Sequence, residues 1–164
     1  MIDYLPFCRC SLAVALPALL LAGCSYRISD AEVLATNEPA AWYTQRDTLP
    51  LELHGQVPGH TGAAIAALSA RALPATAPRQ RIVLYLNGGE GVAEDRLCQA
   101  PTVPGDTPAA GATAVIAALC DRTQAVALVR GSIRSDVGDA QLGADLRGMQ
   151  AELFRVLYET PPPA

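Results

Sequence analysis

Residues 113–133, TAVIAALCDRTQAVALVRGSI, decide the fold. Two runs rich in Val, Ile, Leu and Ala, residues 113–120 and 125–133, flank the polar tetrapeptide DRTQ. Runs of this length and composition are typical of buried β-strands, and a short polar break between them is typical of a turn. The stretch therefore predicts a β-hairpin.

Two more strands are predicted on the N-terminal side of this hairpin. Residues 81–86, RIVLYL, form a nearly unbroken aliphatic run that indicates a central strand. In residues 51–57, LELHGQV, the apolar residues alternate with Glu52, His54 and Gln56. This alternation indicates a half-buried strand with those three polar residues on its solvent face.

Two helices are predicted around these strands. The first covers residues 62–73, with Thr61 as its N-cap and Pro74 as its end. The second covers residues 139–159, where apolar residues recur at spacings of three and four and form one amphipathic stripe. The residues of this stripe are Leu142, Leu146, Met149, Leu153, Val156 and Leu157.

The predicted order β-α-β-β-β-α indicates an α+β fold, a two-layer sandwich with a mixed four-stranded sheet and helices on one face. The first crossover is expected to be right-handed and parallel. We expect one domain over residues 51–160, followed by a Pro-rich tail at 161–164. Because the central strands are apolar on both faces, the uncovered face must meet the N-terminal residues, the loop at 87–112 or a partner; tight self-packing of small Ala residues is the alternative.

The N-terminus contains a short apolar segment that stops abruptly. Residues 10–22 form a run of thirteen apolar or small residues interrupted by Pro17. A membrane-spanning helix needs roughly 20 apolar residues, so this run is better suited to the hydrophobic region of a secretory signal. The run ends in Leu21, Ala22, Gly23 and Cys24.

These four residues resemble the lipobox of bacterial lipoproteins. In that family the Cys thiol receives a diacylglyceryl group, signal peptidase II cuts before the Cys, and the new amine is acylated. The resemblance implies that residues 1–23 are a signal peptide that is removed, with Leu21, Ala22 and Gly23 recognised by the peptidase. It implies that Cys24 is lipidated, with palmitate as an expected acyl chain. An ordinary secreted protein with a chance Cys is the alternative.

The same resemblance implies a location and a tether. Ser25, in place of Asp, after the lipidated Cys implies the cell outer membrane, with the protein lipid-anchored and facing the periplasm. Residues 24–50 show no sustained hydrophobic periodicity and are expected to form a flexible tether with a root-mean-square span of about 28 Å. Within it, Trp42 and Tyr43 are expected to pack onto the edge of the domain, and a docking point is the alternative.

The cysteine count then predicts a disulfide. Of five Cys, Cys8 and Cys10 lie in the expected signal and Cys24 is the expected lipidation site, which leaves Cys98 and Cys120. Because the periplasm is oxidising, these two are expected to form a disulfide. A metal site or a catalytic thiol is the alternative, but neither of the two His residues in the chain flanks either Cys.

No catalytic residues, metal site or cofactor are predicted. His54 is expected to be solvent-exposed on its strand, with a metal site that includes His54 and His60 as the alternative, and the adjacent Glu94 and Asp95 are expected to solvate a loop. Residues 87–91, NGGEG, lack the spacing and the Lys of phosphate-binding loops. The net charge of −4, with no basic patch, argues against a nucleic acid partner.

The function expected from the sequence is a lipid-anchored, non-enzymatic module that binds or helps assemble another envelope component. The topology resembles that of auxiliary lipoproteins of ABC-type lipid transporters and of curli secretion lipoproteins. The segments RLCQAP and AALCDR are similar to those of uncharacterised proteobacterial lipoproteins with two such Cys. An auxiliary subunit of lipid or small-molecule transport is the first alternative, and an envelope hydrolase is the second.

Overall fold

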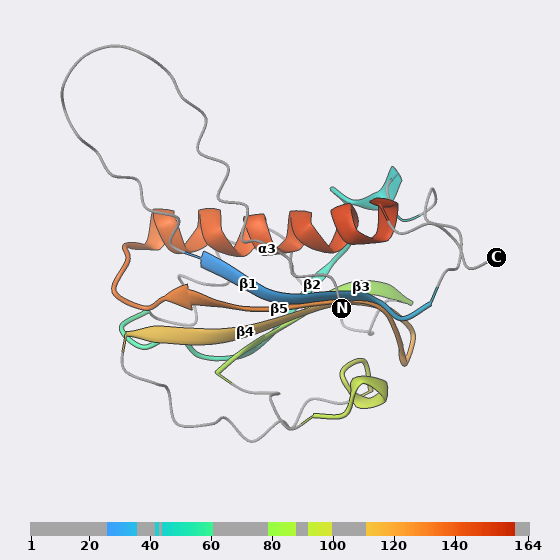
Figure 1. Ribbon diagram of the computed structural model, residues 1–164, viewed down its shortest axis with the longest axis horizontal. Helices are drawn as coiled ribbons and strands as arrows, with labels where there is room; N and C mark the ends of the chain where they lie inside the picture. The colour runs from blue at the N-terminus through green and yellow to red at the C-terminus, as the bar shows by residue number, and fades with distance from the viewer. Residues whose placement is uncertain are drawn as a thin grey trace, which may run out of the picture.

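The computed structural model describes residues 26–35, 42, 44–60, 79–87, 92–99 and 111–159. They form a five-stranded sheet in the order β1-β5-β4-β3-β2, with one long helix packed over one face (Figure 1). The elements are β1 (Tyr26–Val33), β2 (Leu51–Gly55), β3 (Gln80–Leu86), the 3-10 turn η1 (Glu94–Arg96), β4 (Ala112–Asp121), β5 (Gln124–Arg134) and α3 (Asp139–Glu159).

The sheet confirms the α+β class and the predicted hairpin. β4 and β5 pair antiparallel up to Asp121 and Gln124, and Arg122 takes a positive φ of 54° in the turn between them. β2 and β3 are parallel, whereas β3 and β4 are antiparallel, so the sheet is mixed as predicted. The helix predicted over residues 139–159 is α3.

The predicted strand count and element order are wrong. The sheet has five strands rather than four, because β1, which was assigned to the tether, pairs antiparallel with β5. In the described ranges the order is five strands, with η1 between the third and fourth, followed by α3. The helix predicted over residues 62–73 lies outside the described residues.

A β-bulge explains why β1 was not predicted from the sequence. The register of β1 against β5 shifts between Ile28 and Asp30, so Ser29 is an inserted residue. Ile28, Ala31 and Val33 therefore all pack on the core under α3, although a regular strand would point Ile28 and Ala31 to opposite faces. The inserted residue breaks the two-residue period by which a strand is read from sequence.

The end of β2 also differs from the prediction. The strand was expected to continue to residue 57, but it stops at Gly55, which has a positive φ of 85°. A Cβ atom at this position would lie 1.9 Å from the carbonyl oxygen of Leu86 on the neighbouring strand β3. Gly is therefore required where β2 leaves the sheet.

The main core lies between the sheet and α3. Apolar side chains from all five strands pack there against Leu142, Met149 and Leu153 of the helix, which are fully buried. Trp42 is 2% exposed and belongs to the same core, so its predicted packing is confirmed, while Tyr43 lies outside the described residues.

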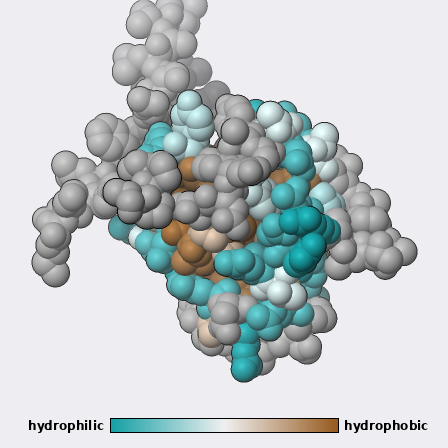
Figure 2. Space-filling view, turned by 90° about the vertical axis from the view of Figure 1, so that its right-hand side faces the viewer, coloured by the Kyte–Doolittle hydropathy of each residue, from teal (hydrophilic) through white to brown (hydrophobic). Residues whose placement is uncertain are grey.

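Few large apolar side chains are exposed among the described residues. Of the large apolar residues that the structure describes, Tyr26 and Tyr158 are the exposed ones, at 36% and 73%. Figure 2 shows one side of the molecule, where apolar side chains are visible next to hydrophilic ones.

The opposite face of the sheet is covered by residues 92–99, which we call the cover segment. Leu97 and Cys98 of this segment pack on a second buried cluster that contains Val83 and Ile116. Of the alternatives left open for this face, the loop at 87–112 contributes the cover segment, which includes η1.

Candidate functional site

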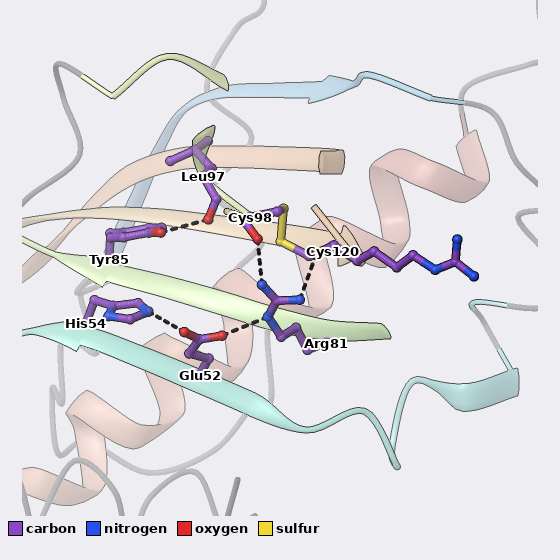
Figure 3. The surroundings of a disulfide bond; sticks show 8 residues. Glu52, His54, Arg81, Tyr85, Leu97, Cys98 and Cys120 are labelled. Atoms are coloured by element: carbon purple, nitrogen blue, oxygen red, sulfur yellow. Dashed lines mark hydrogen bonds and ion pairs between the residues drawn. A yellow bond between two sulfur atoms is a disulfide. The ribbon is translucent and has the colours of Figure 1, made fainter. Parts of the chain in front are cut away.

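A disulfide fixes the cover segment to the sheet. Cys98 of the cover segment and Cys120 of β4 have an S–S distance of 1.96 Å and a Cα–Cα distance of 5.6 Å (Figure 3). Both are buried, at 2% and 0% exposure. The predicted pairing is confirmed, and it leaves no free thiol at either position.

A buried arginine lies directly beside this disulfide. Arg81 of β3 is paired in register with Cys120, and its side chain is 9% exposed. Its three nitrogen atoms donate in three directions: Nε to Glu52 Oε2 at 2.7 Å, one terminal nitrogen to the Arg122 carbonyl oxygen at 2.8 Å, and the other to the Cys98 carbonyl oxygen at 2.7 Å. Arg81 thus connects β2, the β4–β5 turn and the cover segment (Figure 3).

Glu52 and His54 extend the network along β2. Glu52 receives the Arg81 hydrogen bond on one carboxylate oxygen, and its other oxygen lies 2.8 Å from His54 Nε2. The His54 ring stacks on Tyr85 of β3, with 4.9 Å between centroids and 19° between planes. Because β2 and β3 are parallel and in register, these residues lie on the same face of the sheet.

Tyr85 makes the second polar attachment of the cover segment. Its hydroxyl donates to the Leu97 carbonyl oxygen at 2.7 Å, one residue before the carbonyl that Arg81 binds. Burial raises the pKa of Tyr85 above its ordinary value, and the negative charge of Glu52 raises it further, whereas the Arg81 charge lowers it. The phenol therefore stays protonated and acts as a hydrogen-bond donor.

The raised pKa of Tyr85 predicts a late step in an alkaline titration. Because the folded pKa lies above 10.0, the value of the unfolded chain, the stabilisation is complete below about pH 10 and is lost as pH rises through the folded pKa. Tyrosinate absorbance should show a late ionisation step that coincides with unfolding. The Tyr85→Phe variant should lack this step, and an unchanged titration curve would contradict the assignment.

Arg130 forms a further connection at η1. It donates to Glu94 of η1 at 3.1 Å and to Asp30 of β1 at 3.2 Å. The Arg130 side chain is 31% exposed and those of Glu94 and Asp30 are 42% and 54% exposed, so water screens both pairs. This connection orients the cover segment, and the buried Arg81 network carries more of its stability.

The arrangement is suited to holding the cover segment, and its two histidines are paired with carboxylates. His54 and His60 bind different carboxylates, since His60 Nδ1 lies 2.7 Å from Asp139 Oδ1 at the start of α3. The expectation of a solvent-exposed His54 is wrong, because its side chain is 18% exposed, and the side chain of His60 is 6% exposed. Among the described residues, no three potential metal ligands come together.

Sequence reasoning identified the two Cys but missed Arg81 and Glu52. Arg81 opens an apolar strand, a position where a charged residue signals either a strand end or a buried partner. Choosing between the two required the register of β2, β3 and β4. The residues of the expected lipobox, Leu21, Ala22, Gly23 and Cys24, lie outside the described residues.

No described helix has the length and hydrophobicity needed to cross a bilayer. Comparison of the chain with protein-family models, with curated proteins and with solved structures gives no match.

Proposed function

We propose that this chain is a lipid-anchored, non-enzymatic module of the bacterial cell envelope that binds or helps assemble another envelope component. The observation that carries the proposal is the position of Cys24, at the end of Leu21-Ala22-Gly23 and directly after a thirteen-residue apolar run. A thiol placed there suits acylation, and two or more acyl chains hold a protein stably on a membrane.

The disulfide supports export from the cytosol. Cys98 and Cys120 are bonded within the covered face, and they are the two cysteines that remain once residues 1–23 are removed and Cys24 is acylated. Disulfides persist in oxidising compartments such as the periplasm. The expected location is the outer membrane, with the domain facing the periplasm.

The start of β1 limits how far the domain stands from its anchor. Only Ser25 separates Cys24 from Tyr26, the first residue of β1. Two residues span at most about 7 Å, far less than the tether of about 28 Å expected from the sequence. An acylated Cys24 would therefore hold the edge of the sheet at the membrane surface, where the domain meets partners in the same membrane.

The buried network supports a binding role over an enzymatic one. Each of the three guanidinium nitrogens of Arg81 donates a hydrogen bond, the Tyr85 phenol is a donor, and the two Cys are oxidised. Each group stabilises the covered face rather than offering a reactive atom. The packing of Leu97 and Cys98 against this face gives no support to the alternative of a ligand carrier with its cavity there.

The anchor is tested by the Cys24→Ser variant. The unaltered chain should partition into the membrane fraction and the detergent phase, and its N-terminal peptide should carry the mass of acyl chains on Cys24. Cys24→Ser should lose the acyl mass because Ser offers no thiol for acylation, and it should keep residues 1–23 because cleavage follows acylation of the Cys. The matched control is Cys10→Ser, which lies upstream of the cleavage site and should behave as the unaltered chain. A mature product that retains residues 1–23, or carries a free thiol at 24, would overturn the proposal.

A further inference from the structure

β1 occupies an edge of the described sheet and carries two exposed charges, Arg27 and Glu32. Within the part of the chain that the structure describes, its hydrogen-bonded neighbour is β5, on one side (Figure 1). Arg27 and Glu32 are both exposed and form no ion pair with any described residue, whereas Asp30 between them is bound by Arg130. Arg27 and Glu32 lie five residues apart on an extended strand, about 16 Å, so they cannot reach each other.

The bulge changes which residues of β1 point to each face of the sheet. Ile28, Ala31 and Val33 pack on the core under α3, and the Tyr26 ring lies against Gly148 of that helix. The opposite face receives the other residues of the strand, Arg27, Asp30 and Glu32, which are paired in register with Ser132, Arg130 and Leu128. Two residues, Ser29 and Asp30, thus separate Ile28 from Ala31, although both point to the same face.

This sorting makes β1 complementary to itself. Residues opposite each other in an antiparallel pair point to the same face. Consider two copies of β1 aligned antiparallel, with the two-fold axis between Ser29 and Asp30. In each opposed pair for which the face of both residues is given above, the two residues then point to the same face of the sheet. The pairs are Tyr26 with Val33 of the second copy, Arg27 with Glu32, and Ile28 with Ala31.

Neighbouring registers fail the same rule. Sliding the second copy by one residue, so that Asp30 faces Asp30, places Ile28 opposite Glu32 and two carboxylates opposite each other. Two copies of a strand without a bulge could not pair in the register that places Arg27 opposite Glu32. Side chains of such a strand alternate between the two faces, so opposed residues in this register would point to different faces. The bulge therefore discourages pairing with ordinary edge strands and favours a strand with the same bulge.

We infer that β1 is an interface through which two copies of this chain pair antiparallel and extend the sheet across a two-fold axis. The two-fold axis brings Arg27 of each copy opposite Glu32 of the other, so each of these two charges, which have no ion-pair partner among the described residues, gains one in the dimer. The inference rests on β1 alone and is independent of the anchor at Cys24.

The test is a charge exchange on the full chain, extracted from cells in a mild detergent and analysed by sedimentation equilibrium. The unaltered chain should dimerise reversibly. Arg27→Glu and Glu32→Arg should each weaken the dimer by roughly tenfold, because each turns two attractive pairs into repulsive ones. The double variant Arg27→Glu/Glu32→Arg restores both pairs and should return the dissociation constant to within about threefold of the original. Arg46→Glu, an exposed charge reversal away from β1, is the matched control and should leave dimerisation unchanged.

A cross-link gives a second measurement that does not depend on charge. Ser29 of the two copies flank the two-fold axis, so Ser29→Cys should be joined efficiently by a short bifunctional thiol reagent, whereas Thr123→Cys in the exposed β4–β5 turn should not. A chain that stays monomeric at all concentrations, single reversals without effect, or a double variant that fails to recover would each overturn the inference.

Discussion

Replacing Arg81 by Met is expected to lower the free energy of unfolding by about 3–5 kcal/mol, the range seen when one partner of a buried ion pair is removed. The side chain is 9% exposed and donates to Glu52 and to two backbone carbonyl oxygens. Met fills a similar volume but donates no hydrogen bond. Glu52 would then be a partly buried carboxylate without its cation, and the carbonyls of Cys98 and Arg122 would lose a charged donor.

Urea unfolding of the purified chain measures this loss, and two variants separate its causes. Arg81→Lys keeps the charge but has one nitrogen, which cannot reach all three acceptors, so its stability should lie between those of Arg81→Met and the unaltered chain. Arg79→Ala, two residues away, removes an exposed arginine that binds Asp121 and should leave the unfolding midpoint nearly unchanged. A midpoint for Arg81→Met close to that of the unaltered chain would show that the network contributes little.

The hairpin at 113–133 was predictable because both of its strands are apolar on consecutive positions and the break between them is short. Helix α3 was predictable because its apolar residues keep one period over its whole length. β1 was missed because the inserted Ser29 breaks the alternation, and because the exposed Arg27, Asp30 and Glu32 are also what a soluble linker would show.

The candidate site was predictable only in part, for a related reason. The disulfide follows from counting cysteines once the compartment is inferred, and that count needs no knowledge of which strands are neighbours. Arg81, Glu52 and the Leu97 and Cys98 carbonyls come together from β3, β2 and the cover segment. Their meeting depends on the parallel register of β2 with β3 and on the path of the loop, and no local pattern encodes either.

Removing the disulfide is the other change expected to have a large effect. The double variant Cys98→Ala/Cys120→Ala should lose about 3 kcal/mol of stability, because the bond closes a loop with a sequence separation of 22 residues and the unfolded chain gains that freedom. Reductant should destabilise the unaltered chain to a similar extent and leave the double variant unaffected. Equal stability of the two chains without reductant would contradict the expected contribution.

The loss of the disulfide should also weaken the Arg81 network, since Arg81 binds the carbonyl of Cys98 itself. When the cover segment is no longer bonded to β4, it can separate from the sheet and expose Val83, Ile116 and Leu128, which a dye specific for apolar surface would detect. Arg81→Met should then cost less in the Cys98→Ala/Cys120→Ala background than in the unaltered chain, because part of its effect is already lost. Strict additivity of the two free-energy changes would mean that the disulfide and Arg81 hold the cover segment independently.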